Sequence, residues 1–172
     1  FFYKIHGLDS DKFAALSGFA TLVVFSIVLF VPIIKEKLGY KLAIPLTQLT
    51  AIFALIIMAL TEIIPYQYAV IIAMVAYVIR QPLMNMAGPM TSDIVMKYVG
   101  EKNREMMSAL TAAIWSGSWF ISSIIFQVLR KIGLQYVYVF LITAGLYFIG
   151  VFLYYLLILD YEKKLKSGEI ED

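Results

Sequence analysis

The sequence predicts an all-α integral membrane protein with five transmembrane helices. Hydrophobic residues make up 62% of the 172 positions and charged residues only 15%, whereas a soluble domain usually has about a quarter charged residues. The mean hydropathy is +0.84. Five long apolar stretches are separated by short polar segments, and each is long enough for the roughly 20 residues that cross a bilayer core.

The composition also limits the chemistry. The chain has no cysteine and one histidine, His6, which excludes disulfides, thiolate metal sites, cysteine nucleophiles and a histidine metal cluster. We expect no metal, no cofactor and no nucleic-acid partner. His6 lies in a polar segment and is expected to be solvated. Because the chain opens with Phe1 and FFYKIHGLDS has no signal-peptide features, we expect a fragment of a longer protein whose first residues end a preceding helix.

The first two spans follow in order. Ser10 is a suitable N-cap, and residues 13–34 carry no charge. The basic segment KEKLGYK at 35–41 is predicted to be a loop. The second span, 42–61, ends before Glu62 and Pro65 and is almost uniformly apolar, so it is expected to face lipid.

The third span, 66–97, differs from the others because it has a charge at its centre. Arg80 follows Tyr66 by 14 residues and precedes Lys97 by 17, which places it near the bilayer midplane at about 1.5 Å rise per residue. An arginine there costs about 2.5–3.5 kcal/mol on the insertion scale, so it must face protein or water. At about 100° per residue, a polar stripe bordered by Arg80 forms one face of this helix: Tyr77, Gln81, Asn85, Gly88 and Ser92.

Two interpretations of Arg80 stay open. In the first, the stripe lines a substrate or proton pathway, in which Arg80 holds an anion or pairs with an acid. In the second, Arg80 belongs to a buried structural ion pair. No acid lies at matching depth, because the candidate acids are all at or near span ends: Glu36, Glu62, Asp93, Glu101, Glu105 and Asp160. The partner is therefore expected in a missing part of the protein, or is the cargo.

The fourth span, 106–129, has a second stripe and many small residues at four-residue spacing. The stripe consists of Thr111, Trp115, Ser118 and Ser122. A close-packing helix face is the main interpretation, and a cavity wall in which Trp115 and Trp119 contact cargo is the alternative. The fifth span, 134–159, is apolar and expected to face lipid, and residues 160–172 are expected to form a polar tail.

Loop charges predict the orientation. One side has nine basic residues: Lys35, Lys37, Lys41, Lys97, Lys102, Arg104, Lys163, Lys164 and Lys166. The other side has four: Lys4, Lys12, Arg130 and Lys131. The first side, with the C-terminus, is therefore predicted to be cytoplasmic in a protein of the cell membrane. Asp93, near this side, is expected to form a gate or a salt bridge with Arg104 or Lys97, and proton coupling is the alternative.

The order of these features resembles the C-terminal half of a major facilitator superfamily transporter, over nearly the whole chain. PIIKEKLGYK is similar to the family's loop motif G-x-L-x-D-R-x-G-R-R/K, with Glu36, Lys37, Gly39 and Lys41 at matching positions, while Pro32 replaces the first glycine and Tyr40 a base. The resemblance implies helices 8 to 12 of twelve, preceded by the end of helix 7, with the N-terminal half absent from this sequence. It also implies that the 66–97 helix lines a central cavity.

These observations favour a secondary transporter that moves a small solute by alternating access. Its expected partners are the bilayer, the solute and the N-terminal half of the same transporter. Coupling to protons or another ion follows from the resemblance alone, and Arg80 favours an anionic group on the cargo. Cavity-lining roles are expected for Arg80, Gln81, Asn85, Tyr77, Ser92, Trp115 and Ser118. The alternatives are a non-transporting assembly or sensor subunit and, disfavoured by the absence of a nucleophile–base pair or acid cluster, a membrane enzyme.

Overall fold

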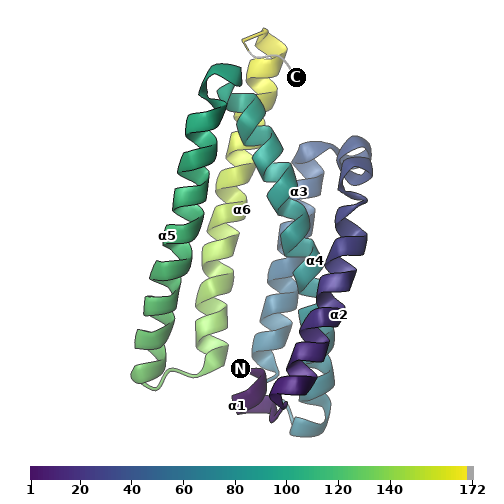
Figure 1. The fold of residues 1–172 in the computed structure, drawn as a ribbon, viewed down its shortest axis with the longest axis vertical. Coiled ribbons are helices and arrows are strands. Elements are labelled where there is room, and N and C mark those ends of the chain that lie inside the picture. The colour runs from purple at the N-terminus through teal and green to yellow at the C-terminus, as the bar shows by residue number, and fades with distance from the viewer. Residues whose placement is uncertain (170–172) are drawn as a thin grey trace.

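The computed structural model describes residues 1–169, which fold into α-helices and one 3₁₀ turn (Figure 1). The elements in chain order are α1 (Phe2–His6), α2 (Ser10–Val28), α3 (Val31–Leu60), α4 (Tyr66–Val99), η1 (Glu101–Asn103), α5 (Arg104–Lys131) and α6 (Tyr136–Ser167). Five of the described helices, α2 to α6, are long and apolar enough to cross a membrane. The expectation of an all-helical chain is confirmed for residues 1–169, and these five helices suggest a multi-pass membrane protein.

The segment between the first two spans is helical, so the predicted loop at 35–41 is wrong. α2 ends at Val28 rather than at residue 34, and α3 begins at Val31 with Pro32 in its first turn. Proline suits this position because the first turn of a helix needs no backbone N–H donor. Gly39 then interrupts α3 with φ 65° and ψ 170°, a left-handed conformation that glycine adopts without steric cost. α3 is therefore a short helix joined to a spanning helix through Gly39.

α6 continues well past the predicted end of its span. Residues 160–167 are helical rather than a loose tail, and residues 170–172 of the predicted tail lie outside the described part of the chain. The segment contains three lysines, one glutamate and one leucine, all of which are good helix formers. The helix ends at Gly168, whose φ of 75° allows a left-handed C-cap.

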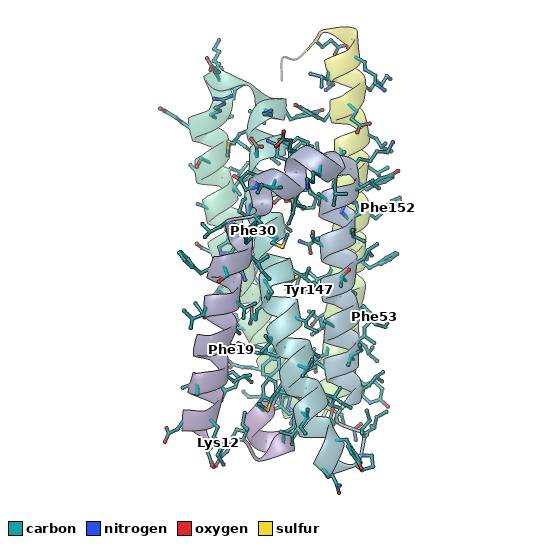
Figure 2. All side chains as sticks on the ribbon, turned by 90° about the vertical axis from the view of Figure 1, so that its right-hand side faces the viewer. Lys12, Phe19, Phe30, Phe53, Tyr147 and Phe152 are labelled. Carbon is teal, nitrogen blue, oxygen red and sulfur yellow. The ribbon has the colours of Figure 1, made fainter. Side chains whose placement is uncertain are left out.

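α3 is the most buried of the spanning helices, contrary to the expectation that it faces lipid. It packs against both α4 and α6, and its fully buried positions include Ala43, Ile44, Ala51 and Ala59. Alanines at these positions let neighbouring helices approach closely, which is the main source of packing energy in lipid. Only one face of α3 is exposed, and Figure 2 shows Phe53 of α3 and Phe152 of α6 on the same side of the molecule.

α5 lies at the edge of the bundle (Figure 1) and packs least of the five long helices. None of its residues is buried, and its main contacts are with α4 and η1. The predicted close-packing face of the fourth span therefore has no packing partner among residues 1–169. The packed body consists of α2, α3, α4 and α6, and α4 crosses it obliquely.

Candidate functional site

A cavity of about 470 Å³ lies beside the middle of α4, between α1, α2, α3 and α6. Most of its lining is aromatic: Phe1, Phe2, Tyr3, Phe13, Tyr77 and Phe140. Ser10, Ala14, Met58 and Arg80 complete the lining. Because Phe1, α1 and the first turn of α2 contribute four of these six rings, the cavity lies toward the end of the bundle where the α3–α4 turn is (Figure 1).

α4 supplies two lining residues, Tyr77 and Arg80, which are three positions apart and therefore share one helix face. Side chains on a helix lean toward its N-terminus, so Arg80 points along α4 in the direction of α1. The Tyr77 ring lies 5.5 Å from the Phe2 ring and 5.9 Å from the Phe13 ring, measured between centroids. These contacts fix the aromatic wall next to the guanidinium group.

The guanidinium group of Arg80 is incompletely paired. Its Nε is buried and has no hydrogen-bond partner within residues 1–169. No carboxylate is among the residues that line the cavity in the described part of the chain. A buried donor without a partner costs about 1–3 kcal/mol, and more when it is charged. The structural ion pair that the sequence left open for Arg80 is therefore not found among residues 1–169, and the arrangement suits an incoming anion.

The other predicted cavity residues lie elsewhere. Gln81 is half-buried, and Asn85 is exposed and donates its Nδ2–H to the Gln81 carbonyl oxygen at 2.8 Å. Ser92 is also exposed and does not line the cavity. On α5, Trp115 is 66% exposed, and Ser118 donates to the Trp115 carbonyl oxygen at 2.8 Å. Of the seven predicted cavity residues, only Tyr77 and Arg80 meet in one cavity.

Sequence reasoning missed the aromatic residues that other helices bring to Arg80. Phe2 packs between Phe13 and Tyr77, with a centroid distance of 5.4 Å to the Phe13 ring. Phe140 of α6 lies 5.0 Å from the Phe1 ring. The aromatic run FFY at the start of the chain was the available signal, although its position opposite Arg80 depends on tertiary packing.

The opposite end of the bundle has a polar cluster around Asp93. Asp93 forms an ion pair with Lys35 and accepts a hydrogen bond from the Tyr40 hydroxyl at 2.5 Å. The expected salt bridge therefore exists, but its partner is Lys35 rather than Arg104 or Lys97, because the α2–α3 junction folds onto α4. Arg104 instead lies 3.8 Å from Glu101.

The predicted loop-motif residues have unequal roles. Gly39 provides the backbone break in α3, and Lys41 lies 3.9 Å from Glu162 of α6. Glu36 and Lys37 are exposed. Nearby, the Tyr98 hydroxyl donates to Asp160 at 2.6 Å, which joins α4 to α6. This end is therefore held by side chains from α3, α4 and α6.

At the end of the bundle with the cavity, Thr61 and Glu62 of the α3–α4 turn contact α1 and α6, respectively. His6 is only 2% exposed, and its Nε2 lies 3.1 Å from Thr61 Oγ1, so the expectation of a solvated His6 is wrong. Burial lowers the pKa of His6 below its ordinary value near 6.5, while Glu62 opposes this shift. Glu62 accepts hydrogen bonds from the backbone N–H groups of Tyr136 (3.3 Å) and Val137 (2.5 Å). A carboxylate here suits the positive end of the α6 dipole.

Comparisons with known proteins give this chain no relative. No protein-family model matches it, and no curated protein and no solved structure matches it either.

Proposed function

We propose that this chain is part of a secondary active transporter that moves a small anionic solute across the cell membrane by alternating access. The observation that carries the proposal is Arg80, a mid-span cation whose Nε is buried without a partner beside a cavity that has no carboxylate in its described lining. Ionisable residues inside membrane spans are costly and usually mark a substrate or ion path. We assign Arg80 the role of binding the anionic group of the cargo.

The resemblance to the C-terminal half of a major facilitator superfamily transporter supports the same proposal. On this interpretation the α4 helix lines the central cavity, the N-terminal half covers the remaining wall, and the end with Asp93 and the C-terminus is cytoplasmic. The basic residues at that end support the orientation. Proton or ion coupling comes from the resemblance alone. We propose no enzymatic step.

The test is uptake by the full-length protein from its source, reconstituted in liposomes, with the variants Arg80→Ala and Arg80→Lys. The solutes offered are a panel of labelled organic anions. We expect Arg80→Ala to lower kcat/KM by about tenfold or more, since a charge-assisted hydrogen bond contributes about 1.5–3 kcal/mol, and Arg80→Lys to retain part of the activity. Arg104→Ala is the matched control, because Arg104 lies outside the cavity. Normal uptake with unchanged KM in both Arg80 variants would show that Arg80 does not bind the cargo.

The exposed α5 favours a second candidate, a membrane assembly or sensor subunit. All residues of α5 are at least partly exposed, including Trp115 and Trp119, whose rings lie 6.1 Å apart. A subunit of this kind would show no Arg80-dependent uptake of any anion in the panel. Its α5 variants, rather than its Arg80 variants, would change the size of the complex purified from the source.

A further inference from the structure

We infer that the cargo is an organic anion with a hydrophobic body, such as an aromatic or branched aliphatic carboxylate, rather than a hydrophilic anion. This inference rests on the proposed transport function, because it assigns the substrate class of the same cavity. It starts from the contrast inside the lining, which contains six aromatic residues and one guanidinium group.

The guanidinium group determines the charge of the ligand. The Nε of Arg80 is a buried donor without a partner among the described residues. A neutral carbonyl can accept one hydrogen bond from a guanidinium group but leaves its charge unbalanced, whereas a carboxylate balances the charge and accepts two parallel hydrogen bonds. No described lining residue is acidic, so nothing in the described wall repels an anion. The anionic group is therefore expected at the α4 side of the cavity, next to Tyr77.

The rings determine the rest of the ligand. Phe2, Phe13 and Tyr77 form one continuous aromatic wall, with centroid distances of 5.4–5.9 Å between neighbours. Phe1 and Phe140 form a second pair at 5.0 Å. Aromatic walls of this kind attract apolar surface and stack with rings in edge-to-face or offset geometry.

A hydrophilic anion would be a poor fit for this lining. Apart from Arg80, the polar side-chain groups in the lining are the hydroxyls of Tyr3, Ser10 and Tyr77. A sugar phosphate or a hydroxy acid has several hydroxyl groups, and each one left without a partner in the cavity weakens binding. The cavity volume of about 470 Å³ is within the range of roughly 300–1,000 Å³ that is usual for small-molecule sites.

The experiment measures equilibrium binding to the full-length protein in phosphatidylcholine nanodiscs with three probes: 2-naphthoate, its neutral amide 2-naphthamide, and glycerate. We expect 2-naphthoate to bind at least about tenfold more tightly than either of the other two, a difference of about 1.4 kcal/mol. Glycerate binding as tightly as 2-naphthoate would overturn the hydrophobic class. Equal binding of 2-naphthoate and its amide would overturn the anionic class.

Matched variants locate the binding site. Arg80→Gln should remove the preference for 2-naphthoate over the amide, and Phe13→Ala should weaken both ligands by about tenfold. Arg104→Gln and Phe53→Ala are the controls, because neither residue lines the cavity and both are exposed. Unchanged naphthoate affinity in Arg80→Gln would overturn the assignment, and the wild-type comparison of probes decides the substrate class even if a variant fails to fold.

A competition experiment then distinguishes a membrane fatty acid from a water-soluble carboxylate as the natural ligand. Oleate added to the nanodiscs should displace 2-naphthoate in an Arg80-dependent way if the natural ligand is a membrane fatty acid, and should leave its binding unchanged if the ligand is a water-soluble carboxylate. Failure of this substrate class is distinguishable from failure of transport. Arg80-dependent uptake of a hydrophilic anion would preserve the proposed function and overturn the inference.

Discussion

α4 and α5 are both candidate membrane-spanning helices with a polar stripe, yet they differ in how far the other helices cover them. α4 crosses the packed body and brings Arg80 and Tyr77 to a pocket with a mostly aromatic lining, whereas α5 has no buried residue. The stripe residue Ser118 of α5 donates to the Trp115 carbonyl oxygen of its own helix, and the stripe residue Asn85 of α4 likewise donates to the Gln81 carbonyl oxygen. A polar stripe therefore becomes a site only where other elements cover it, as α1 and α2 cover Arg80.

The largest expected difference between the two helices is in packing energy. Ile94 of α4 is fully buried in the cluster with Ala43 and Ile158, whereas Ile114 of α5 is 62% exposed. Ile94→Ala should lower the free energy of unfolding by about 2–5 kcal/mol, and Ile114→Ala by less than about 0.5 kcal/mol. Denaturation of both variants in one detergent measures the difference. A cost above about 1 kcal/mol for Ile114→Ala would mean that a partner covers α5 in the full-length protein.

A smaller difference in stability is expected between the two glutamates that lie near the N-termini of α6 and α5. Glu62 accepts hydrogen bonds from two backbone N–H groups at the start of α6, while Glu105 is exposed in the first turn of α5. Glu62→Gln replaces one acceptor oxygen with a donor and removes the charge, so it should cost about 1–3 kcal/mol of stability. Glu105→Gln is the control, with an expected cost below about 0.5 kcal/mol. Equal melting temperatures for the two variants would show that Glu62 does not hold α6.

The smallest expected effect is the pH dependence from His6, which lies outside the candidate spans. Because the folded state lowers the pKa of His6, the unfolded chain binds more protons in the interval below the ordinary value near 6.5. Stability is therefore full above pH about 6.5 and falls as the pH is lowered through that value toward the lower folded pKa. Glu62 opposes the lowering of the His6 pKa and so limits the effect, whereas the N-terminal amino group adds to it.

His6→Gln provides the matched control for this prediction. Glutamine retains a group that can hydrogen-bond to Thr61 and does not titrate, so its stability should change less than that of the wild type between pH 7.5 and about 5.5. The measurement is the melting temperature of both proteins across this range. Identical pH profiles would show that His6 is not the titrating group.

The helical class and the central charge of α4 were predictable from the sequence. Hydropathy and length identify the spans, and the absence of an acid at the depth of Arg80 anticipated its unpaired Nε. Gly39 was singled out as part of a motif, and it is the residue that breaks α3. These predictions succeeded because they depend on local composition or on position along one helix.

The predictions that failed depend on which elements meet. His6 was expected to be solvated because its neighbours in sequence are polar, but α1 folds back onto Thr61. The apolar α3 was expected to face lipid, yet its alanines make it the centre of the bundle. In a membrane, apolar residues suit lipid and protein equally well, so hydropathy does not identify which apolar helix is central.

The most direct test of the central claim uses the absence of cysteine from this sequence. Ala14→Cys places a thiol in the cavity lining, and Ala15→Cys places one next to it on α2, outside the lining. The measurement is the ratio of labelling rates for an anionic and a cationic methanethiosulfonate reagent. It is made for each cysteine variant in two backgrounds, one that retains Arg80 and one that carries Arg80→Gln. We predict that Arg80→Gln lowers this anion preference by about tenfold at Ala14→Cys, the effect of about 1.4 kcal/mol of charge interaction, and leaves Ala15→Cys unchanged. A ratio at Ala14→Cys that does not depend on Arg80 would contradict the assignment of this cavity as an anion site.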